Sequence, residues 1–166
     1  MPRKNWQSMV KHGEAMMNSK RVSAEIEFAV EFYDVDSMRI VWHGNYIKYF
    51  EKARCALLNK VGYNYLQMEE SGYQFPVTSI SAKYVGSFRF GERVHALAIL
   101  DEYENCIKIR YELRDAATGE LRTRGNSTQM AVNAVTGESR FSCPKIFTDR
   151  VEALLSENPP LAGNQQ

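Results

Sequence analysis

Apolar and polar residues alternate along the segment from residue 24 to residue 32. One side of this pattern holds the apolar residues Ile26, Phe28, Val30 and Phe32, and the other holds glutamates at positions 25, 27 and 31. A period of two residues indicates a β-strand with one face toward the core and one toward solvent. We therefore expect a half-buried strand over 24–32.

Helical spacing replaces this alternation from about residue 45. Apolar residues then recur three and four positions apart, from Tyr46 through Phe50 and Leu57 to Val61. Such spacing is typical of an amphipathic helix whose apolar stripe faces a core. Gly62 follows, and glycine commonly ends a helix because it adopts the left-handed conformation without strain. The pattern predicts a long helix over 45–61.

Four more strand-like segments follow the predicted helix, at residues 75–84, 92–102, 106–115 and 121–133. Gly119 and Gly137 lie in short turn sequences and supply the positive φ that such turns need. The segment 94–100 is almost wholly apolar, as expected for a central strand with both faces covered. These segments predict an antiparallel meander.

The order of strand, helix and meander predicts an α+β domain in which a curved antiparallel sheet wraps one long apolar helix. The length of 166 residues fits a single domain. We place this domain at residues 23–157, including a short C-terminal helix near 147–155. Residues 1–22 form a basic N-terminal extension with five Lys or Arg residues and one Glu, and residues 158–166 form a polar tail.

Composition narrows the function. The formal net charge is +1, so the sequence gives no reason to expect nucleic acid as a partner. We expect no membrane span, because no stretch reaches ~20 apolar residues, and the absence of a secretory pattern favours a cytoplasmic protein. The three cysteines are widely spaced, which favours reduced thiols over a disulfide frame or a zinc site. We also expect no metal and no tightly bound cofactor.

Reactive side chains gather where the predicted strand gives way to the predicted helix. Asp34, Asp36 and His43 precede the helix start at Asn45. A carboxylate, an imidazole and the free amides of a helix N-terminus are the groups that a carbonyl-directed hydrolase needs. A structural interpretation is also open, since short polar residues often cap turns and His43 would then be a surface histidine.

The same block resembles the signature of the hotdog-fold acyl-CoA thioesterases, in particular the 4-hydroxybenzoyl-CoA thioesterase-like branch. That signature is an Asp-x-Asp pair, a short loop, two apolar residues, an aromatic, often His, then Asn-Tyr and a helix with an aromatic followed by Phe-Glu-x-Ala-Arg. The matching positions, without a gap, are Asp34, Asp36, Val41, Trp42, His43, Asn45, Tyr46, Phe50, Glu51, Ala53 and Arg54. The chain departs from the pattern at Ser37-Met38-Arg39, where many relatives have a glycine, and this leaves the acyl group open.

The resemblance, which covers about residues 24–142, implies the hotdog fold and hydrolysis of an acyl thioester carried by coenzyme A or by an acyl carrier protein. The family's essential acidic residue falls on Asp36, as base or as nucleophile. The backbone at His43 and Gly44 would polarise the carbonyl, and the His43 side chain would orient substrate or share protons with Asp36. Asp34 fits a structural hydrogen bond to the loop better than a direct role.

Other expectations also follow from the resemblance. Family members are dimers or tetramers with active sites between subunits, so we expect a homodimer or homotetramer. The substrate-binding candidates are Trp42, Asn45, Tyr46 and Phe50, although aromatic residues at helical spacing are more often part of the core.

Two other functions remain open on the sequence. The first is a protein that binds acyl thioesters without hydrolysing them. The second is a hotdog dehydratase acting on a 3-hydroxyacyl thioester, which also needs an acid and a base. The dehydratase ranks last, because an Asp-x-Asp pair followed by His-x-Asn-Tyr resembles the thioesterase branch.

Overall fold

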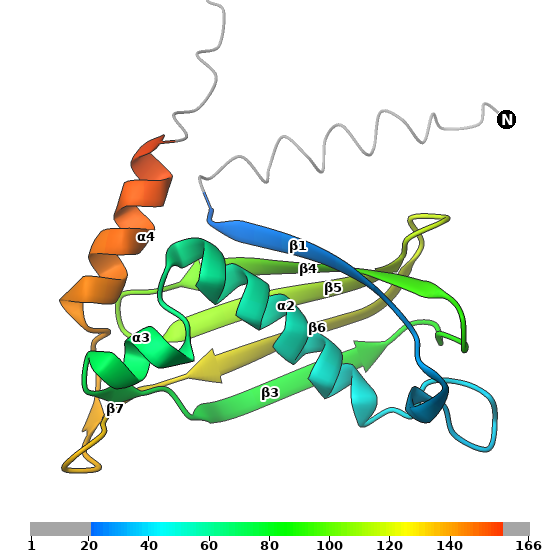
Figure 1. Ribbon diagram of the computed structural model, residues 1–166, viewed down its shortest axis with the longest axis horizontal. Coiled ribbons are helices and arrows are strands. Elements are labelled where there is room, and N and C mark those ends of the chain that lie inside the picture. The colour runs from blue at the N-terminus through cyan, green and yellow to red at the C-terminus, as the bar shows by residue number, and fades with distance from the viewer. Residues whose placement is uncertain (1–20, 158–166) are drawn as a thin grey trace, which may run out of the picture.

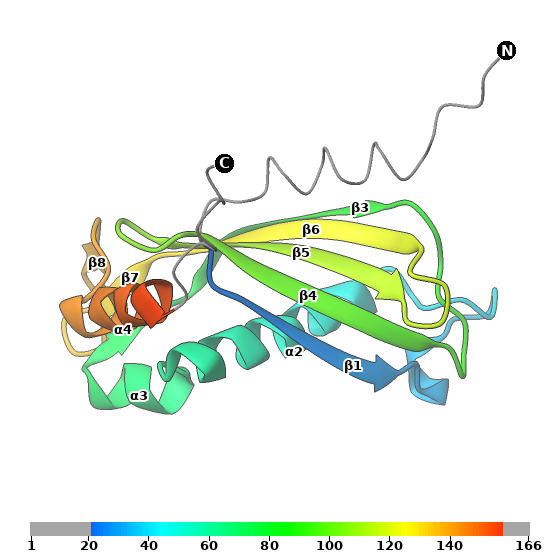
Figure 2. The ribbon, with the colours of Figure 1, turned by 90° about the horizontal axis from the view of Figure 1, so that it is seen from above.

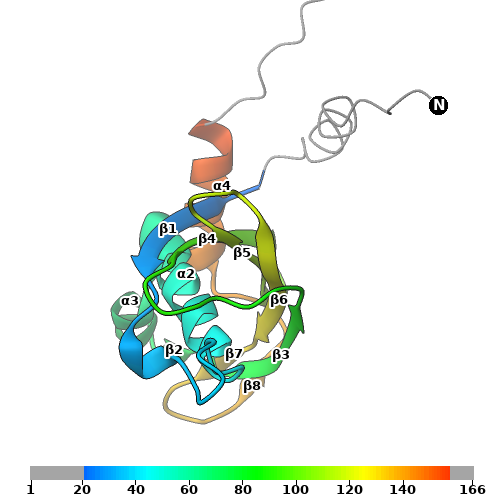
Figure 3. The ribbon, with the colours of Figure 1, turned by 90° about the vertical axis from the view of Figure 1, so that its right-hand side faces the viewer.

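The computed structural model describes residues 21–157 and shows a long helix lying inside the curve of an antiparallel sheet (Figures 1 and 3). The elements, in chain order, are β1 (Ser23–Ala29), the 3-10 turn η1 (Phe32–Asp34), α2 (Asn45–Val61), α3 (Tyr65–Glu70), β2 (Tyr73–Gln74), β3 (Val77–Tyr84), β4 (Arg93–Glu102), β5 (Ile107–Asp115), β6 (Leu121–Gln129), β7 (Ala131–Asn133), β8 (Ser139–Arg140) and α4 (Lys145–Glu157).

The main sheet has five strands in the order β1-β4-β5-β6-β3, and all neighbours are antiparallel. Strands β1 and β3 are therefore the two edges, while β4 has a hydrogen-bonded neighbour on each side. A second, three-stranded sheet of β2, β7 and β8 lies near α3 and α4 at one end of the molecule (Figure 2). Helix α2 packs mainly against β1 and β4.

The core forms between the buried stripe of α2 and the inner face of the main sheet. Phe50 stacks on Tyr111 of β5 with ring centroids 4.7 Å apart. Gly125 of β6 leaves room for this pair, since a Cβ atom there would lie 2.4 Å from the Phe50 ring. Burying a large apolar side chain in such a core stabilises the fold by about 1.5–3 kcal/mol.

The prediction of the long helix is confirmed at both ends. Helix α2 spans Asn45–Val61, and Gly62 ends it with a φ of 74° while its N–H donates to the carbonyl oxygens of Asn59 and Leu58. Gly119 and Gly137 also have positive φ, as the turn patterns predicted.

The strand predictions need four corrections. The strand predicted over 24–32 ends at Ala29, and Phe32, which was expected on the apolar face, lies in η1 and is 76% exposed. The segment predicted at 75–84 is a strand only from Val77 to Tyr84. Phe75 and Pro76 separate this strand, β3, from the short β2, and Pro76 has no N–H to donate to a ladder. The segment 121–133 is also divided, because the Met130 N–H bonds to the Pro76 carbonyl. Strand β4 is central, but its outer face is only half covered, since His95 and Leu97 remain partly exposed.

Helix α3 was not expected from the sequence. Asn64 caps its N-terminus: the Asn64 side chain accepts the Leu66 N–H, while the Gln67 side chain accepts the Asn64 N–H in return. This capping box was present in the sequence as a start signal. Most of the basic extension (1–20) and the polar tail (158–166) lie outside the described residues. Between residues 21 and 157, no helix combines the length and the apolar character that crossing a membrane requires.

Candidate active site

Residues 34–42 form a tight hairpin-like loop that leads into α2. Val35 and Val41 form an isolated antiparallel bridge, and the Asp36 N–H donates to the Ile40 carbonyl at 2.9 Å. Arg39 closes the turn with a φ of 61°, a left-handed conformation that favours glycine. Within the Ser37-Met38-Arg39 stretch, one residue therefore has a backbone conformation typical of glycine but carries an arginine side chain.

Asp34 is buried and fastens this loop to the helix. Its Oδ2 accepts the Tyr49 hydroxyl at 2.8 Å and the Glu31 N–H at 3.0 Å. Its carbonyl oxygen accepts the Asn45 side-chain amide at 2.9 Å and the Trp42 N–H at 2.9 Å. These contacts agree with the structural hydrogen bond expected for Asp34.

The pKa of the Tyr49 hydroxyl responds to the same arrangement. Burial and the hydrogen bond to Asp34 hold this pKa well above its usual range. Tyr49 therefore stays protonated and acts as a permanent donor to the Asp34 carboxylate.

Asp36 is half-buried and has one oxygen engaged. Its Oδ1 accepts the Met38 N–H at 2.8 Å, which fixes the turn. Its Oδ2 has no hydrogen-bond partner among residues 21–157. One oxygen thus holds the side chain in place, and the other is available for a further hydrogen bond.

The start of α2 has free backbone donors. Gly44 is the N-cap residue, and no side chain caps the helix there. The Asn45 N–H donates to the Trp42 carbonyl at 2.8 Å, whereas the His43 and Gly44 N–H groups meet no acceptor among residues 21–157. Unpaired amides at a helix N-terminus carry partial positive charge and bind oxygen atoms that bear negative charge.

Trp42 and His43 stand at the surface beside this helix start. Their rings lie 4.9 Å apart, and 49% of Trp42 is exposed. The Trp42 indole lies against Gly44 so closely that a Cβ there would be 2.1 Å from the ring. The small size of Gly44 thus makes room for the indole.

The other substrate-binding candidates lie deeper. Phe50 is 0% exposed and belongs to the core. Tyr46 is also buried, and its hydroxyl accepts the Phe88 N–H at 3.2 Å. The Asn45 side chain is committed to the Asp34 carbonyl. Of the four candidates, only Trp42 presents substantial surface on a single chain.

Sequence reasoning missed the segment 85–92, which joins β3 to β4 and packs against the loop. The Phe88 carbonyl accepts the Val41 N–H at 2.8 Å, and Ile40 forms a bridge with Arg89. From the neighbouring strand end, the Tyr84 hydroxyl donates to the His43 carbonyl at 2.9 Å. The only local signal is a pair of glycines, Gly86 and Gly91, which is too weak to identify a site.

Glu51 and Arg54, which match the family helix, pair with each other one turn apart. The Arg54 Nε also donates to the Tyr65 hydroxyl at 3.0 Å, which links α2 to α3. Both side chains therefore have structural partners, and these explain their positions without a role in the site.

Comparisons with known proteins agree with this architecture. A model of the Thioesterase-like superfamily matches residues 30–157. YneP of Bacillus subtilis, provisionally assigned as an acyl-CoA thioesterase, is 30% identical over 108 residues, which are 64% of this chain and 78% of that protein. Among solved structures, a DHNA-CoA thioesterase from Staphylococcus aureus is 25% identical, with a TM-score of 0.69 over 84% of this chain and 97% of that one.

A variant of 4-hydroxybenzoyl CoA thioesterase, solved with 4-hydroxybenzoyl CoA, shares the fold at 18% identity, with a TM-score of 0.69 over 78% of this chain and 99% of that one. The match of the superfamily model over most of the chain, together with a sheet curved round one long helix, shows that this protein belongs to the thioesterase-like superfamily and has the hotdog fold.

Proposed function

We propose that this protein hydrolyses an acyl thioester to a free acid and a thiol, with Asp36 and the backbone N–H of His43 as the central groups. One observation carries the proposal: the free amides at the start of α2 follow directly on the braced loop that holds the half-buried Asp36. The names of the relatives support the reaction class, because YneP and the Staphylococcus aureus enzyme are both named for CoA thioesters.

In this reaction Asp36 activates or supplies the nucleophile, and the His43 N–H stabilises the carbonyl oxygen. If Asp36 is the base, its free oxygen takes a proton from water, and the water oxygen attacks the thioester carbon. If Asp36 is the nucleophile, it forms a mixed anhydride as the thiolate leaves, and water then hydrolyses the anhydride. In both routes the C–S bond breaks and negative charge develops on the carbonyl oxygen, where the His43 N–H would donate.

The exposed imidazole of His43 has a supporting role in this scheme. Its ring nitrogens can donate or accept a hydrogen bond, so the side chain can orient the substrate or pass a proton to the departing thiolate. Trp42, beside it, offers an apolar surface to the acyl group.

A second copy of the chain would complete the site. Strand β3 is an unpaired edge, and its Val77, Ile80 and Tyr84 side chains are all exposed. One end of β3 lies at His43, and the other follows Pro76, which lines a cavity of about 420 Å³ together with Met68 and other mainly apolar residues.

Within one chain, helix α2 keeps this cavity away from His43, because its 17 residues span about 25 Å. Antiparallel pairing of two β3 strands about a twofold axis would bring the cavity of one copy beside His43 of the other. We therefore propose a homodimer, or a tetramer built from such dimers, in which this cavity receives the acyl group.

Asp36→Asn tests the activity directly. Thiol release from a panel of acyl-CoA substrates and one acyl carrier protein substrate should fall by at least about 10²-fold, because the amide is neither a base nor a nucleophile. Asp149→Asn is the matched control, since Asp149 is exposed on α4 and pairs only with Lys145 among the described residues. An Asp36→Asn protein with the wild-type rate would overturn the assignment, and wild-type protein that binds acyl-CoA without releasing thiol would favour a binding function.

A further inference from the structure

The segment 85–92 contacts both the loop 34–42 and helix α2, and so supports the candidate site. It holds the loop through the Phe88 carbonyl, which accepts the Val41 N–H, and it reaches α2 through the Phe88 N–H, which donates to the Tyr46 hydroxyl. The position of the loop that ends in His43 therefore depends on the position of Phe88.

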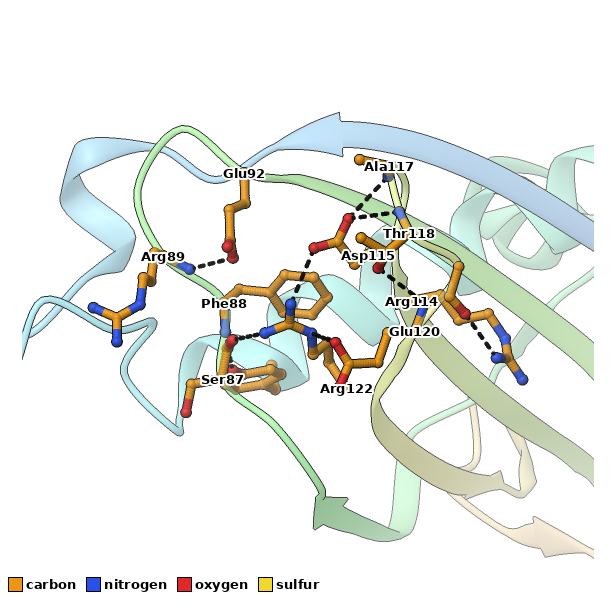
Figure 4. Close-up of polar contacts among 12 residues, drawn as sticks. Ser87, Phe88, Arg89, Glu92, Arg114, Asp115, Ala117, Thr118, Glu120 and Arg122 are labelled. Carbon is orange, nitrogen blue, oxygen red and sulfur yellow. Dashed lines mark hydrogen bonds and ion pairs between the residues drawn. The ribbon is translucent and has the colours of Figure 1, made fainter.

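Arg122 of β6 in turn holds this segment in place (Figure 4). Its Nη1 donates to the Ser87 carbonyl at 2.7 Å, and its guanidinium carbon lies 5.7 Å from the centre of the Phe88 ring. Its backbone carbonyl accepts the N–H groups of Val85 and Gly86 at 2.8 and 2.9 Å. One residue thus contacts four successive positions of the segment.

The guanidinium is itself anchored on its far side. Arg122 Nη2 donates to Asp115 at 3.1 Å, and Nε lies 3.3 Å from a Glu120 carboxylate oxygen. The other Asp115 oxygen accepts the N–H groups of Ala117 and Thr118 in the β5–β6 turn. These backbone donors and Arg122 hold the pKa of the Asp115 carboxyl below its usual range, so the anchor stays charged at neutral pH.

We propose that Arg122 is a positioning residue for thioester hydrolysis, acting through Ser87 and Phe88 on the backbone at Val41–His43. The inference rests on the function proposed above. The Val41 N–H is tied to Phe88, and His43 follows only two residues later, so movement of Phe88 displaces the His43 N–H. Displacing a reacting group by about 1 Å can reduce a rate by about 10²-fold.

Arg122→Gln tests this role against Arg114→Gln. Arg114 lies on the same hairpin and donates to Glu112 and to the Gly119 carbonyl, but it has no hydrogen bond to segment 85–92 (Figure 4). We expect kcat of Arg122→Gln to fall about 10- to 100-fold while KM changes less than about threefold, with wild-type values for Arg114→Gln. Methylguanidinium should restore part of the kcat of Arg122→Ala, because it can occupy the vacated space; a general loss of stability would not respond in this way.

Gly86→Ala perturbs the same link without removing a charge. Its Cβ would lie 2.9 Å from Arg122 Cδ, so the arginine must shift. This variant should also lose kcat more than it changes KM. If Arg122→Gln and Arg122→Ala do not fold, Gly86→Ala still tests the positioning role of Arg122.

Hydrogen exchange at the Val41 amide gives a measurement that does not depend on activity. Exchange should accelerate in Arg122→Gln and stay at the wild-type rate in Arg114→Gln. If the wild-type protein hydrolyses no thioester, the proposed function fails and the Val41 exchange rate still decides whether Arg122 positions the loop. If the protein is active but Arg122→Gln matches Arg114→Gln in both kcat and Val41 exchange, the positioning role is overturned.

Discussion

Replacing Tyr49 by phenylalanine isolates one hydrogen bond of the brace at Asp34. The Tyr49 hydroxyl donates to the buried Asp34 carboxylate at 2.8 Å, and the ring packs in the core against Phe28 at 4.8 Å. Phenylalanine keeps the ring and its packing but removes the donor. Asp34 then retains only the Glu31 N–H as a donor to its side chain among the described residues.

The expected cost follows from the charge and burial of the acceptor. A hydrogen bond to a charged group contributes about 1.5–3 kcal/mol, and a buried carboxylate that loses a partner lies at the upper part of this range. For a protein of this size, a loss of about 2.5 kcal/mol lowers Tm by about 5–10 °C. We therefore expect Tyr49→Phe to be clearly destabilised, with the thioesterase rate also reduced because the loop that carries Asp36 is less firmly held.

The pH dependence supplies a second signature of the same bond. The pKa of the Tyr49 hydroxyl lies above its ordinary value of 10.0. Burial is the largest cause, and the hydrogen bond to Asp34 is the next. A group whose pKa is raised on folding stabilises the protein fully below the unfolded pKa, and this stabilisation declines as the pH rises above it. The difference in unfolding free energy between wild type and Tyr49→Phe should thus shrink by about 1 kcal/mol from about pH 9 to about pH 11.

Urea unfolding followed by fluorescence and circular dichroism measures both effects. Tyr63→Phe is the matched control, because Tyr63 is equally buried but its hydroxyl bonds at 2.7 Å to the neutral Ser71 hydroxyl. It should lose only about 1 kcal/mol. If Tyr49→Phe were no less stable than Tyr63→Phe at neutral pH, the account of Asp34 as a charged brace would be refuted.

Three further changes test packing and burial around the site. Gly125→Ala places a Cβ 2.4 Å from the Phe50 ring, so urea unfolding should show a loss of about 1–3 kcal/mol, and an unchanged midpoint would contradict the close packing. Gly44→Ala meets the half-exposed Trp42 indole, which can swing away; tryptophan emission should therefore shift while stability changes by less than about 0.5 kcal/mol, and unaltered emission would count against the contact. Burial raises the pKa of the Cys143 thiol to about 12, so Cys143 should react with a thiol reagent at pH 8 only as fast as the protein unfolds, with Cys143→Ser identifying its signal; rapid labelling of the native protein would show that it is accessible.

The parts of the fold that follow local rules could be predicted from the sequence. The period of the apolar residues and the position of Gly62 determine both ends of α2. Strict alternation likewise identifies β5, whose apolar residues are buried and whose charged residues from Lys108 to Arg114 are at least partly exposed. The break at Pro76 could also have been foreseen, because proline cannot donate within a ladder, whereas the short helix α3 depended on a capping box that is easily overlooked.

The site was only partly predictable, because much of it rests on contacts between distant segments. The aromatic residues of α2 share one helical period, and the period does not distinguish Phe50, which packs on the sheet, from an aromatic residue that faces a substrate. The contact of Trp42 with Gly44 depends on a rotamer. The support from Phe88 and Arg122 joins the loop 34–42, the connection 85–92 and strand β6, which are adjacent only after folding.

The candidate oxyanion donor at His43 is a backbone amide, and this explains why its surroundings are so heavily braced. A side-chain donor is aimed by its own rotamer, but a backbone N–H points wherever the chain is held. Two braces act on this short stretch from opposite sides: Asp34 ties Trp42 and Asn45 from the β1 side, and Phe88 ties Val41 from the β3–β4 side. The two carboxylates of the Asp-x-Asp pair differ in the same way: that of Asp34 accepts the Tyr49 hydroxyl and the Glu31 N–H, whereas that of Asp36 has one oxygen without a hydrogen-bond partner among the described residues.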